Sequence, residues 1–479
     1  MASTVEVAPS AVTHEHSRSS VRTIAGRILS LVIPIALWFA PLKIDPTAKH
    51  AMAVSLFMII AWITEVMPHA VTGLIGCYLF WILGIANFEL AFSGLVDQTP
   101  WFLFGAGLIG MMATKSGLAR RLAYMVMRKA GSSYSGILLG LIITSFLLTL
   151  LVPSGLACVV IMATVALGLM EALGAARGSN IGKGIFVTLT YTAGCFDKMV
   201  IAGASTILGR GLMERAAGLQ IYWSLWFFAF LPCVVVTILF IWQLVLRLFP
   251  AEKGTHEGVS AYLEDSLAKM GPWSAAEKRA MFLMLIAIGL WMTDLLHHIS
   301  PAVIGIGAGL LALTPGLGLL NQEDLKKYNF LPILFVAAAI SMGDVLVQTK
   351  ALDLLTNVMF AWMRPFTAHS ASMVFVTYWT AFFYHIFLGN ELAMLATSIP
   401  PLMNFGKAAG VHLLPLGMVW AFASGGKIFV YQSGVLVAGY AYGYFDSWDV
   451  FRVGLWVTLA ESLILLVLAT TYWPLLGIR

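Results

Sequence analysis

Long apolar runs separated by short polar segments follow one another along the chain from Ile28 onward. A helix that crosses a bilayer needs about 20 predominantly apolar residues, so this pattern predicts an all-α polytopic membrane protein. We expect about eleven membrane-spanning helices. Their apolar cores are residues 28–40, 51–67, 71–86, 101–113, 184–212, 221–248, 280–291, 302–313, 330–347, 413–444 and 453–473.

Two further apolar stretches, residues 135–173 and 370–402, are too long for one span each. A single helix over the first would measure about 60 Å, twice the hydrocarbon thickness. Each stretch is broken near its middle, at Val152-Pro153-Ser154-Gly155 and at Leu388-Gly389-Asn390-Glu391. Two interpretations are open: two full spans with a tight turn, or a re-entrant hairpin whose tip lies inside the membrane. Amphipathic segments at 122–130 and 352–362 precede the stretches and are expected in the interface.

Two of the expected spans are interrupted by polar residues that include a lysine. Residues 423–434 read Ala-Ser-Gly-Gly-Lys-Ile-Phe-Val-Tyr-Gln-Ser-Gly, so Lys427 follows two glycines inside an apolar run. The other interruption is Gly194-Cys195-Phe196-Asp197-Lys198. A lysine at bilayer depth costs about 3 kcal/mol unless it faces protein or water. Broken helices at the midplane form transporter sites, so both breaks are candidate parts of a substrate site.

The two halves of the chain have the same order of features, which indicates an internal repeat. In each half a span is followed by an amphipathic segment, a broken stretch, a span with a lysine-containing break, and a further span. Paired interruptions point to an inverted-topology repeat. The expected divisions are a disordered cytoplasmic N-terminus (1–26), first-half scaffold (27–130), first-half transport elements (131–249), a cytoplasmic loop (250–279), second-half scaffold (280–365) and second-half transport elements (366–479).

The composition agrees with a membrane protein and excludes other classes. Of 479 residues, 60% are hydrophobic and 11% are charged, against roughly 25% charged in soluble proteins. The sequence contains no Lys/Arg-rich run of the kind that indicates nucleic-acid binding. Most of the 28 Lys and Arg residues fall in cytoplasmic segments if the N-terminus is cytoplasmic and both broken stretches are hairpins, so we expect this orientation in the inner membrane. The four separated cysteines predict neither disulfides nor a metal site.

Four motifs occur in a characteristic order along the chain. They are Trp62-Ile63-Thr64-Glu65-Val66-Met67-Pro68 with Ala70-Val71-Thr72-Gly73-Leu74, Phe102-Leu103-Phe104-Gly105, Lys115-Ser116-Gly117-Leu118-Ala119-Arg120-Arg121-Leu122-Ala123, and Asn180-Ile181-Gly182-Lys183-Gly184. Together they resemble the divalent anion:sodium symporter (DASS) family over nearly the whole chain. The resemblance implies a homodimer with eleven spans and two re-entrant hairpins. It also implies a scaffold domain, a mobile transport domain with an elevator motion, and substrates such as dicarboxylates, tricarboxylates or sulfate.

The chain departs from the family pattern at both hairpin tips. The family has Ser-Asn-Thr there, which binds substrate carboxylates and helps to form sodium sites. Here the first tip keeps only the serine and the second only the asparagine, and a lysine replaces the asparagine of the family's Thr-Pro-Pro-Asn motif. These departures favour protons or exchange over sodium as the coupling mode. The resemblance implies that a sodium ion, if one binds, lies near Ser154, Gly194, Asn390 and Ser424; no other cofactor is expected.

The candidate substrate-binding residues lie at the tips and breaks: Ser154, Gly155, Asp197, Lys198, Asn390, Glu391, Ser424, Gly425 and Lys427. Neutral donors at the tips suit the oxygens of a small anion, and a lysine supplies positive charge. Alternatives remain. Ser154 would otherwise be a turn residue, Asp197 a helix cap, and Lys427 the partner of a carboxylate such as Glu391. Glu391 would otherwise be a proton carrier or a water-exposed tip residue. Asp344, His385 and Glu461 are weaker candidates, because lone polar residues in bundles are often packing partners.

These features predict a secondary active transporter of small anions, such as a di- or tricarboxylate or sulfate/sulfonate, across the inner membrane. The expected mechanism is an elevator motion, with proton coupling or exchange favoured over sodium symport. One alternative is a sodium-coupled dicarboxylate symporter. Another, from a different class, is an anion channel lined by the two broken helices. The sequence has no Gly-x-Ser-x-Gly elbow or phosphate-binding loop, so an enzyme is not predicted.

Overall fold

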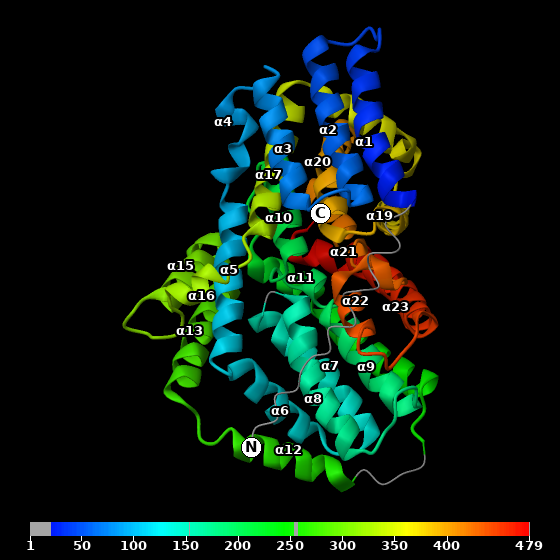
Figure 1. Ribbon diagram of the computed structural model, residues 1–479. Coiled ribbons are helices and arrows are strands. Elements are labelled where there is room, and N and C mark those ends of the chain that lie inside the picture. Colours follow the sequence, from blue (N-terminus) through cyan, green and yellow to red (C-terminus); the bar gives the residue numbers. More distant parts are fainter. Residues whose placement is uncertain (1–20, 153, 253–256, 479) are drawn as a thin grey trace.

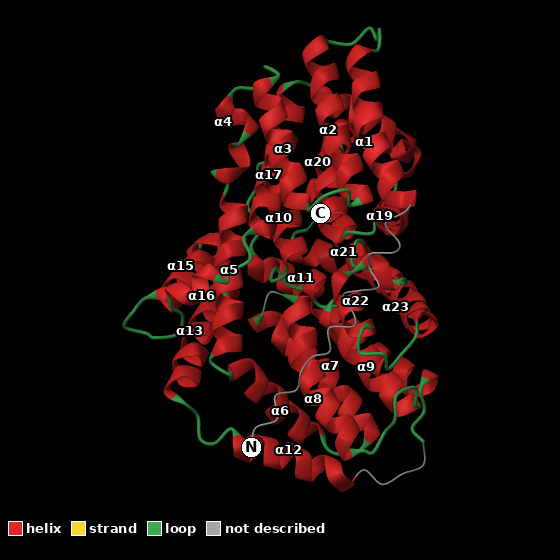
Figure 2. Ribbon diagram, viewed as in Figure 1, coloured by secondary structure: helices red, strands yellow, loops and turns green. Residues whose placement is uncertain are grey.

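The computed structural model describes residues 21–152, 154–252 and 257–478. Within these ranges the regular elements are helices and no strand occurs, as Figure 2 shows, which confirms the predicted all-α class. Residues 1–20, for which disorder was predicted, and Pro153 of the first hairpin tip lie outside the described residues. Helix α1 begins at Val21, so the division expected after residue 26 falls inside a helix.

The helices of the first half pass through a hairpin and a broken helix before reaching a polar connection. In order they are α1 (Val21–Phe39), α2 (Pro46–Thr64), α3 (His69–Ile82), α4 (Phe88–Ala91), α5 (Gln98–Lys115), α6 (Leu118–Ala130), α7 (Tyr134–Leu151), α8 (Gly155–Ala172), α9 (Asn180–Ala193), α10 (Ala204–Ala217) and α11 (Trp223–Leu248). Helices α7 and α8 form the first hairpin, and α9 and α10 form the broken helix. Figure 1 places this hairpin below the centre of the molecule.

The helices of the second half also include a helix pair and a broken helix. Its helices are α13 (Ala275–Met292), α14 (Asp294–His297), α15 (Pro301–Leu313), α16 (Gln322–Lys326), α17 (Leu331–Gln348), α18 (Ala351–Phe360), α19 (Ser370–Leu388), α20 (Glu391–Ala409), α21 (Leu413–Ala423), α22 (Gly434–Tyr440) and α23 (Ser447–Val467). Helices α19 and α20 form the second hairpin, and α21 and α22 form the second broken helix. Both broken stretches are therefore pairs of helices joined at the expected positions.

The lengths of the helices identify a multi-pass membrane protein. Eight described helices are long and apolar enough to cross a membrane, or up to nine if the bent pair α5 and α6 counts as one span. Shorter apolar segments of α1, α3, α15 and α21 fall below this length. The count of eleven spans therefore stays a prediction, because several expected spans are short or interrupted. Helix α6 turns from α5 by 66°, and it has the amphipathic sequence expected at an interface.

Each hairpin packs against broken-helix segments of both halves. Helices α7 and α8 contact α9 of their own half, and α8 also contacts α22 of the other half. In the same way α19 and α20 contact α21, and α20 also contacts α10. This reciprocal packing brings both tips and both breaks into one central region. It is the arrangement expected of two equivalent halves, and it makes the centre the candidate site.

Close backbone packing joins α5 to α15, away from the hairpins. Gly105, Gly305 and Gly309 face one another across this pair. A Cβ atom on Gly309 would lie 2.8 Å from the carbonyl oxygen of Gly105 and 2.9 Å from its Cα atom. Small residues at such positions let membrane helices approach and gain van der Waals contact where lipid gives no hydrophobic driving force. The two helices thus form a rigid pair beside the broken elements.

The polar connection between the halves is largely a helix, α12 (Glu257–Lys269), and not an open loop. It packs on α6 and α8 and runs along the bottom of the view in Figure 1. Val259 and Leu263 are buried, so a narrow apolar face packs this polar segment against α6 and α8. Beside it, buried Arg121 of α6 pairs with Glu277 at 2.6 Å and donates to the carbonyl oxygen of Gly271 at 3.0 Å. Of the first hairpin, α8 is the helix that α12 contacts.

An exposed ion-pair group connects α10 to the long helices beside it. Arg215 near the end of α10 lies 2.9 Å from Asp97, the N-cap of α5, and 2.5 Å from Asp344 of α17. Ser93 also donates to Asp344 at 2.5 Å. Asp344, a weak site candidate from the sequence, is therefore the partner of an arginine at a contact between elements of the two halves.

We predict that Gly309→Ala destabilises the protein because its new methyl group would meet the backbone of α5. Overpacking of this kind typically costs about 1–3 kcal/mol. Thermal unfolding of the purified protein in detergent would measure the loss. Gly307→Ala on the same helix is the matched control, since a Cβ atom there has no neighbour within 4 Å. Equal melting temperatures for the two variants would contradict the close packing of α5 on α15.

Candidate functional site

Two interrupted helices supply the centre of the site. Ten residues, 194–203, separate α9 from α10, and they include one 3-10 turn, η4 (Asp197–Met199). Helix α21 ends at Ala423, and a second 3-10 turn, η6 (Val430–Gln432), precedes α22. Glycine is a weak helix former, which favours interruption in both segments. The breaks also touch: a Cβ atom on Gly425 would lie 3.2 Å from Cγ and Cε of Lys198. Such close contact favours glycine at this position.

Lys427 joins the two breaks to the second hairpin tip. Its ammonium donates to the carbonyl oxygen of Gly194 at 3.0 Å and lies 3.1 Å from Oε2 of Glu391. Gly194 follows the last turn of α9, where free carbonyl groups attract cations. Glu391 is in the first turn of α20, where the helix dipole favours an anion. The Lys427 side chain is 5% exposed, and the ion pair considered as the alternative for this lysine is present.

Lys198 has a separate partner, on the last long helix. Its ammonium lies 2.5 Å from Oε2 of Glu461 in α23, and both side chains are at most 2% exposed. The thiol of Cys195 donates to the other oxygen of Glu461 at 3.4 Å. The ammonium also lies 4.5 Å from the ring centroid of Phe422. Buried charges need such partners, because an ion left alone in a protein interior costs several kcal/mol.

Asp197 lies beside Lys198 but forms no ion pair with any described residue. Its Oδ1 atom is enclosed and has no hydrogen-bond partner among the described residues. The cap of α10 is Gly203, and neither α10 nor η4 has a side-chain cap bond, so Asp197 caps neither helix. With Ser154 and Cys158 of the first hairpin it lines a cavity of about 10 Å³. That volume has room for about one water molecule.

Both hairpin tips are helix N-termini with capping side chains. Ser154 accepts a hydrogen bond from the backbone N–H of Ala157 at 3.3 Å, and Asn390 accepts one from Ala393 at 3.1 Å. Ser154 is therefore the N-cap of α8, a local structural role that differs from the turn residue given as its alternative. The free N–H groups and dipole of a helix N-terminus attract anions. Each tip thus presents a helix end of this kind to the centre of the protein.

The two tips contact the breaks directly. Gly155 packs against Val435 of α22 and against the end of α9, where an added Cβ atom would lie 2.9 Å from the carbonyl oxygen of Ala193. Ser424 lies 3.4 Å from Oε1 of Glu391 and donates to the carbonyl oxygen of Ala421 at 2.7 Å. The nine residues predicted from the sequence therefore lie where the tips and breaks meet.

Three further buried polar residues, Glu461, Gln432 and His385, lie around this centre, and none of them is among the nine residues predicted from the sequence. Glu461 is the partner of Lys198. Gln432 accepts from the backbone N–H groups of Ile428 and Phe429 at 2.7 and 2.8 Å, and the His385 ring lies 3.2 Å from the carbonyl oxygen of Gly426. The signal for Glu461 was its charge within an apolar span. Its partner depended on which helix lies beside the first break.

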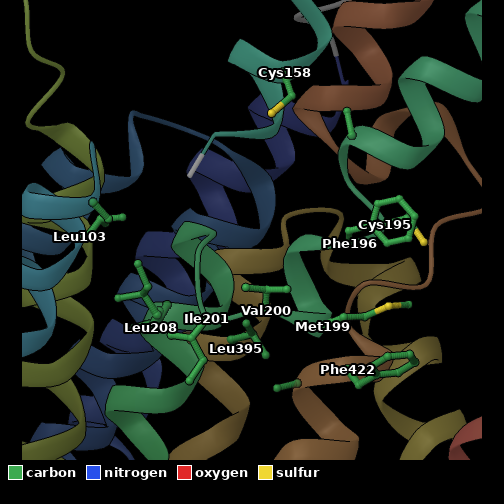
Figure 3. Packing of buried hydrophobic residues seen from close by; sticks show 14 of the residues in the cluster. Leu103, Cys158, Cys195, Phe196, Met199, Val200, Ile201, Leu208, Leu395 and Phe422 are labelled. Carbon is green, nitrogen blue, oxygen red and sulfur yellow. The ribbon is translucent and has the colours of Figure 1, made fainter. Parts of the chain in front are cut away.

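Buried apolar side chains pack around the first break. Figure 3 shows this packing, with neighbours from α10, α20 and α21. The labelled residues of this part of the cluster, each at most 1% exposed, are Phe196, Met199, Val200, Ile201, Leu208, Leu395 and Phe422. Such surroundings lower the local dielectric response and strengthen each electrostatic interaction in the site.

Comparison with known proteins places the chain among membrane transporters. The sequence model described as sodium:sulfate symporter transmembrane region matches residues 21–479. The chain is 25% identical to the citrate/succinate antiporter of Escherichia coli K12 over 488 residues, covering 94% of this chain and 98% of the relative. It is 22% identical to a putative malate transporter of Bacillus subtilis over 487 residues, covering 94% and 96%. It is 23% identical to chloroplastic dicarboxylate transporter 1 of Arabidopsis thaliana over 471 residues, covering 94% and 83%.

We predict that Glu461→Gln lowers the stability of the protein, because it leaves the ammonium of Lys198 without a counter-charge. Breaking a buried pair in this way costs about 3–5 kcal/mol. The double variant Lys198→Met with Glu461→Leu should recover most of the loss, since a packed apolar pair is close to neutral. Thermal unfolding in detergent would compare the variants.

The control for this prediction is Asp265→Asn, which breaks an exposed pair with Lys269 on α12. Exposed pairs contribute about 0–1 kcal/mol, so its melting temperature should stay near that of the unmodified protein. A Glu461→Gln protein as stable as this control would show that the buried pair does not hold the first break.

Proposed function

This chain belongs to the sodium:sulfate symporter family, and from that premise we propose that it is a secondary active transporter of small anions across the inner membrane. The proposed substrates are di- or tricarboxylates, with sulfate or sulfonates as the inorganic and sulfonic members of the same charge class. Support comes from the named relatives, which are citrate/succinate, malate and dicarboxylate transporters. No catalytic activity is proposed.

The observation that carries this proposal is the position of Lys427. Its buried ammonium lies between the end of α9 and the tip of the second hairpin, at the N-terminus of α20. A carboxylate or sulfonate oxygen there would meet a positive charge and free backbone N–H groups. We assign the anion to the region bounded by Ser154, Asn390, Ser424 and Lys427, next to the glycines at positions 155 and 425. Lys198 adds positive charge from the first break.

In the described arrangement, the carboxylate of Glu391 pairs with the ammonium of Lys427. This ion pair affects how an anion would bind. A substrate carboxylate would join this ion pair or take the place of Glu391 at the ammonium. Because Glu391 comes from a hairpin tip, such an exchange would separate the tip from the break without breaking a helix. Binding of the anion would then be coupled to movement of the second hairpin through this ion pair.

We further propose an elevator motion in a homodimer, as the family resemblance implies. Hairpins and broken helices would form the moving transport domain, and the remaining helices the scaffold. The reciprocal packing of α8 on α22 and of α20 on α10 supports a single moving body, since each hairpin contacts both halves. The close pair of α5 and α15 supports a stiff scaffold.

Proton coupling or exchange is proposed in preference to sodium symport. Sodium ions in such sites bind unwound carbonyl groups and helix C-terminal ends. Here the carbonyl oxygen of Gly194 accepts from the Lys427 ammonium, and the Ser154 and Asn390 side chains accept from their own helices. A tethered ammonium thus fills a position where a cation would otherwise bind. Sodium-coupled dicarboxylate symport is the alternative.

An anion channel is the alternative from another class, since two broken helices could line a pore. Counterflow in proteoliposomes separates the two. A carrier is stimulated by substrate on the opposite side of the membrane, and a channel is not. Absence of such stimulation with robust uptake would favour the channel.

We predict that Lys427→Ala reduces uptake of the substrate at low concentration by about 10- to 150-fold. This corresponds to loss of one charge-assisted hydrogen bond of about 1.5–3 kcal/mol. Asn390→Ala should reduce it by about 2- to 10-fold, because a neutral hydrogen bond contributes about 0.5–1.5 kcal/mol. Proteoliposome uptake of radiolabelled anion would measure both. Lys407→Ala, at an exposed position of the same hairpin, is the control. Unchanged uptake in both site variants would refute the site.

The substrate class can be identified by stabilisation of the purified protein. An anion that binds only the folded state raises its stability by about 2.7 kcal/mol at 100 times its Kd. We expect dicarboxylates or tricarboxylates to raise the melting temperature without sodium, and Lys427→Ala to abolish the rise. A rise that requires sodium would favour the symporter alternative.

A further inference from the structure

The centre of the protein contains three carboxyl groups and two ammonium groups. Two of the carboxyl groups are paired: Glu391 lies 3.1 Å from the ammonium of Lys427, and Glu461 lies 2.5 Å from that of Lys198. The third, Asp197, has no ion-pair partner among the described residues. If all five groups are ionised, the cluster has one negative charge more than positive charges. Binding of one proton would balance it.

The surroundings of Asp197 suit a proton that binds and leaves. Its Oδ1 atom is enclosed without a hydrogen-bond partner in the described part of the chain. The residue lines the small cavity at the first hairpin tip together with Ser154, Gly155 and Cys158. An ionised carboxylate with an unpaired, enclosed oxygen is costly, whereas its protonated form needs only a hydrogen-bond acceptor. The cavity has room for about one water molecule that could deliver the proton.

The charged groups around Asp197 come from each element that packs on it. Asp197 interacts electrostatically with Lys427 of the second break, with Glu391 of α20, and with Lys198, the next residue in the chain. The thiol of Cys158 faces it from α8. His385 interacts electrostatically with Lys427 and Glu391, and through these two residues with the rest of the cluster. A substrate anion at Lys427 would add negative charge to this cluster, and a proton on Asp197 would offset it.

We infer that Asp197 is the proton-binding residue that couples anion transport to the proton gradient. The inference rests on the proposed transport function. The proton binds a carboxylate oxygen of Asp197 as the anion binds at the tips and breaks. It crosses with the transport elements, and it leaves through the first hairpin tip when the anion is released. No bond of the substrate changes, and nothing is oxidised or reduced.

The test uses the full-length protein in proteoliposomes that contain a pH-sensitive dye, with radiolabelled succinate as the probe and no sodium. An inward proton gradient should drive succinate accumulation and acidify the interior. Asp197→Asn keeps the shape of a protonated aspartate but cannot release a proton. It should lose both accumulation and acidification. Asp265→Asn, on the exposed face of α12, should retain accumulation, acidification and succinate counterflow.

The outcomes separate this inference from the proposed function. Unmodified protein that moves neither succinate nor any other anion of the class would overturn both. Transport in which only a sodium gradient drives accumulation would overturn the inference and leave anion transport standing. Acidification by Asp197→Asn with the pH dependence of the unmodified protein would do the same.

A second variant keeps the inference testable if Asp197→Asn loses all activity. Asp197→Glu retains a titratable carboxyl group one methylene further from the backbone. We expect it to acidify the interior with a shifted pH midpoint, because its oxygens would lie at a different distance from Lys427. An unchanged midpoint would assign the proton to another group and overturn the inference.

Discussion

Two ammonium groups buried in an apolar interior are the constraint on which the centre of this protein depends. Each must be compensated, because a charge taken from water into protein costs several kcal/mol if it is left alone. Lys427 is compensated by a carbonyl group at the end of α9 and by a carboxylate of the second hairpin. Lys198 is compensated by a carboxylate of α23. The carbonyl of Gly194 can accept this bond only because α9 stops there.

Each lysine follows the end of an interrupted helix, but the two have different partners. Glu461 belongs to the long helix α23 and is enclosed with Lys198 on all sides. Glu391 belongs to a hairpin tip, and its side chain is 13% exposed. A contact with a tip can open through movement of one hairpin, whereas separation of Lys198 from Glu461 would disturb the packing of a whole helix. This difference is why we place the substrate anion at Lys427 and give Lys198 the supporting role.

Much of the fold could be predicted from hydrophobic runs and their interruptions, because a bilayer permits few structures. Backbone groups in lipid must be satisfied within a helix, so apolar runs of sufficient length become helices. Both long stretches form helix pairs, and both lysine-containing breaks interrupt helices, at the predicted positions. The re-entrant course of the pairs stays a prediction, since α7, α8 and α19 are each long and apolar enough to cross a membrane. The mostly polar sequence between the two halves predicts a loop, whereas the structure contains helix α12 there. Its helical form depends on two buried side chains that meet α6 and α8, and such contacts cannot be seen in the composition.

The sequence by itself determined which residues reach the centre, since a lysine or carboxylate inside an apolar run is too costly to leave facing lipid. It thereby identified the tips, the breaks and Lys427. Only the tertiary structure decided the partners. The packing of α23 beside the first break gave Lys198 its carboxylate, and the second tip gave Glu391 to Lys427. For the same reason, Oδ1 of Asp197 is enclosed without a hydrogen-bond partner in the part of the chain that the structure describes. Pairing depends on distances between elements far apart in the chain, and hydrophobic periodicity contains no information about them.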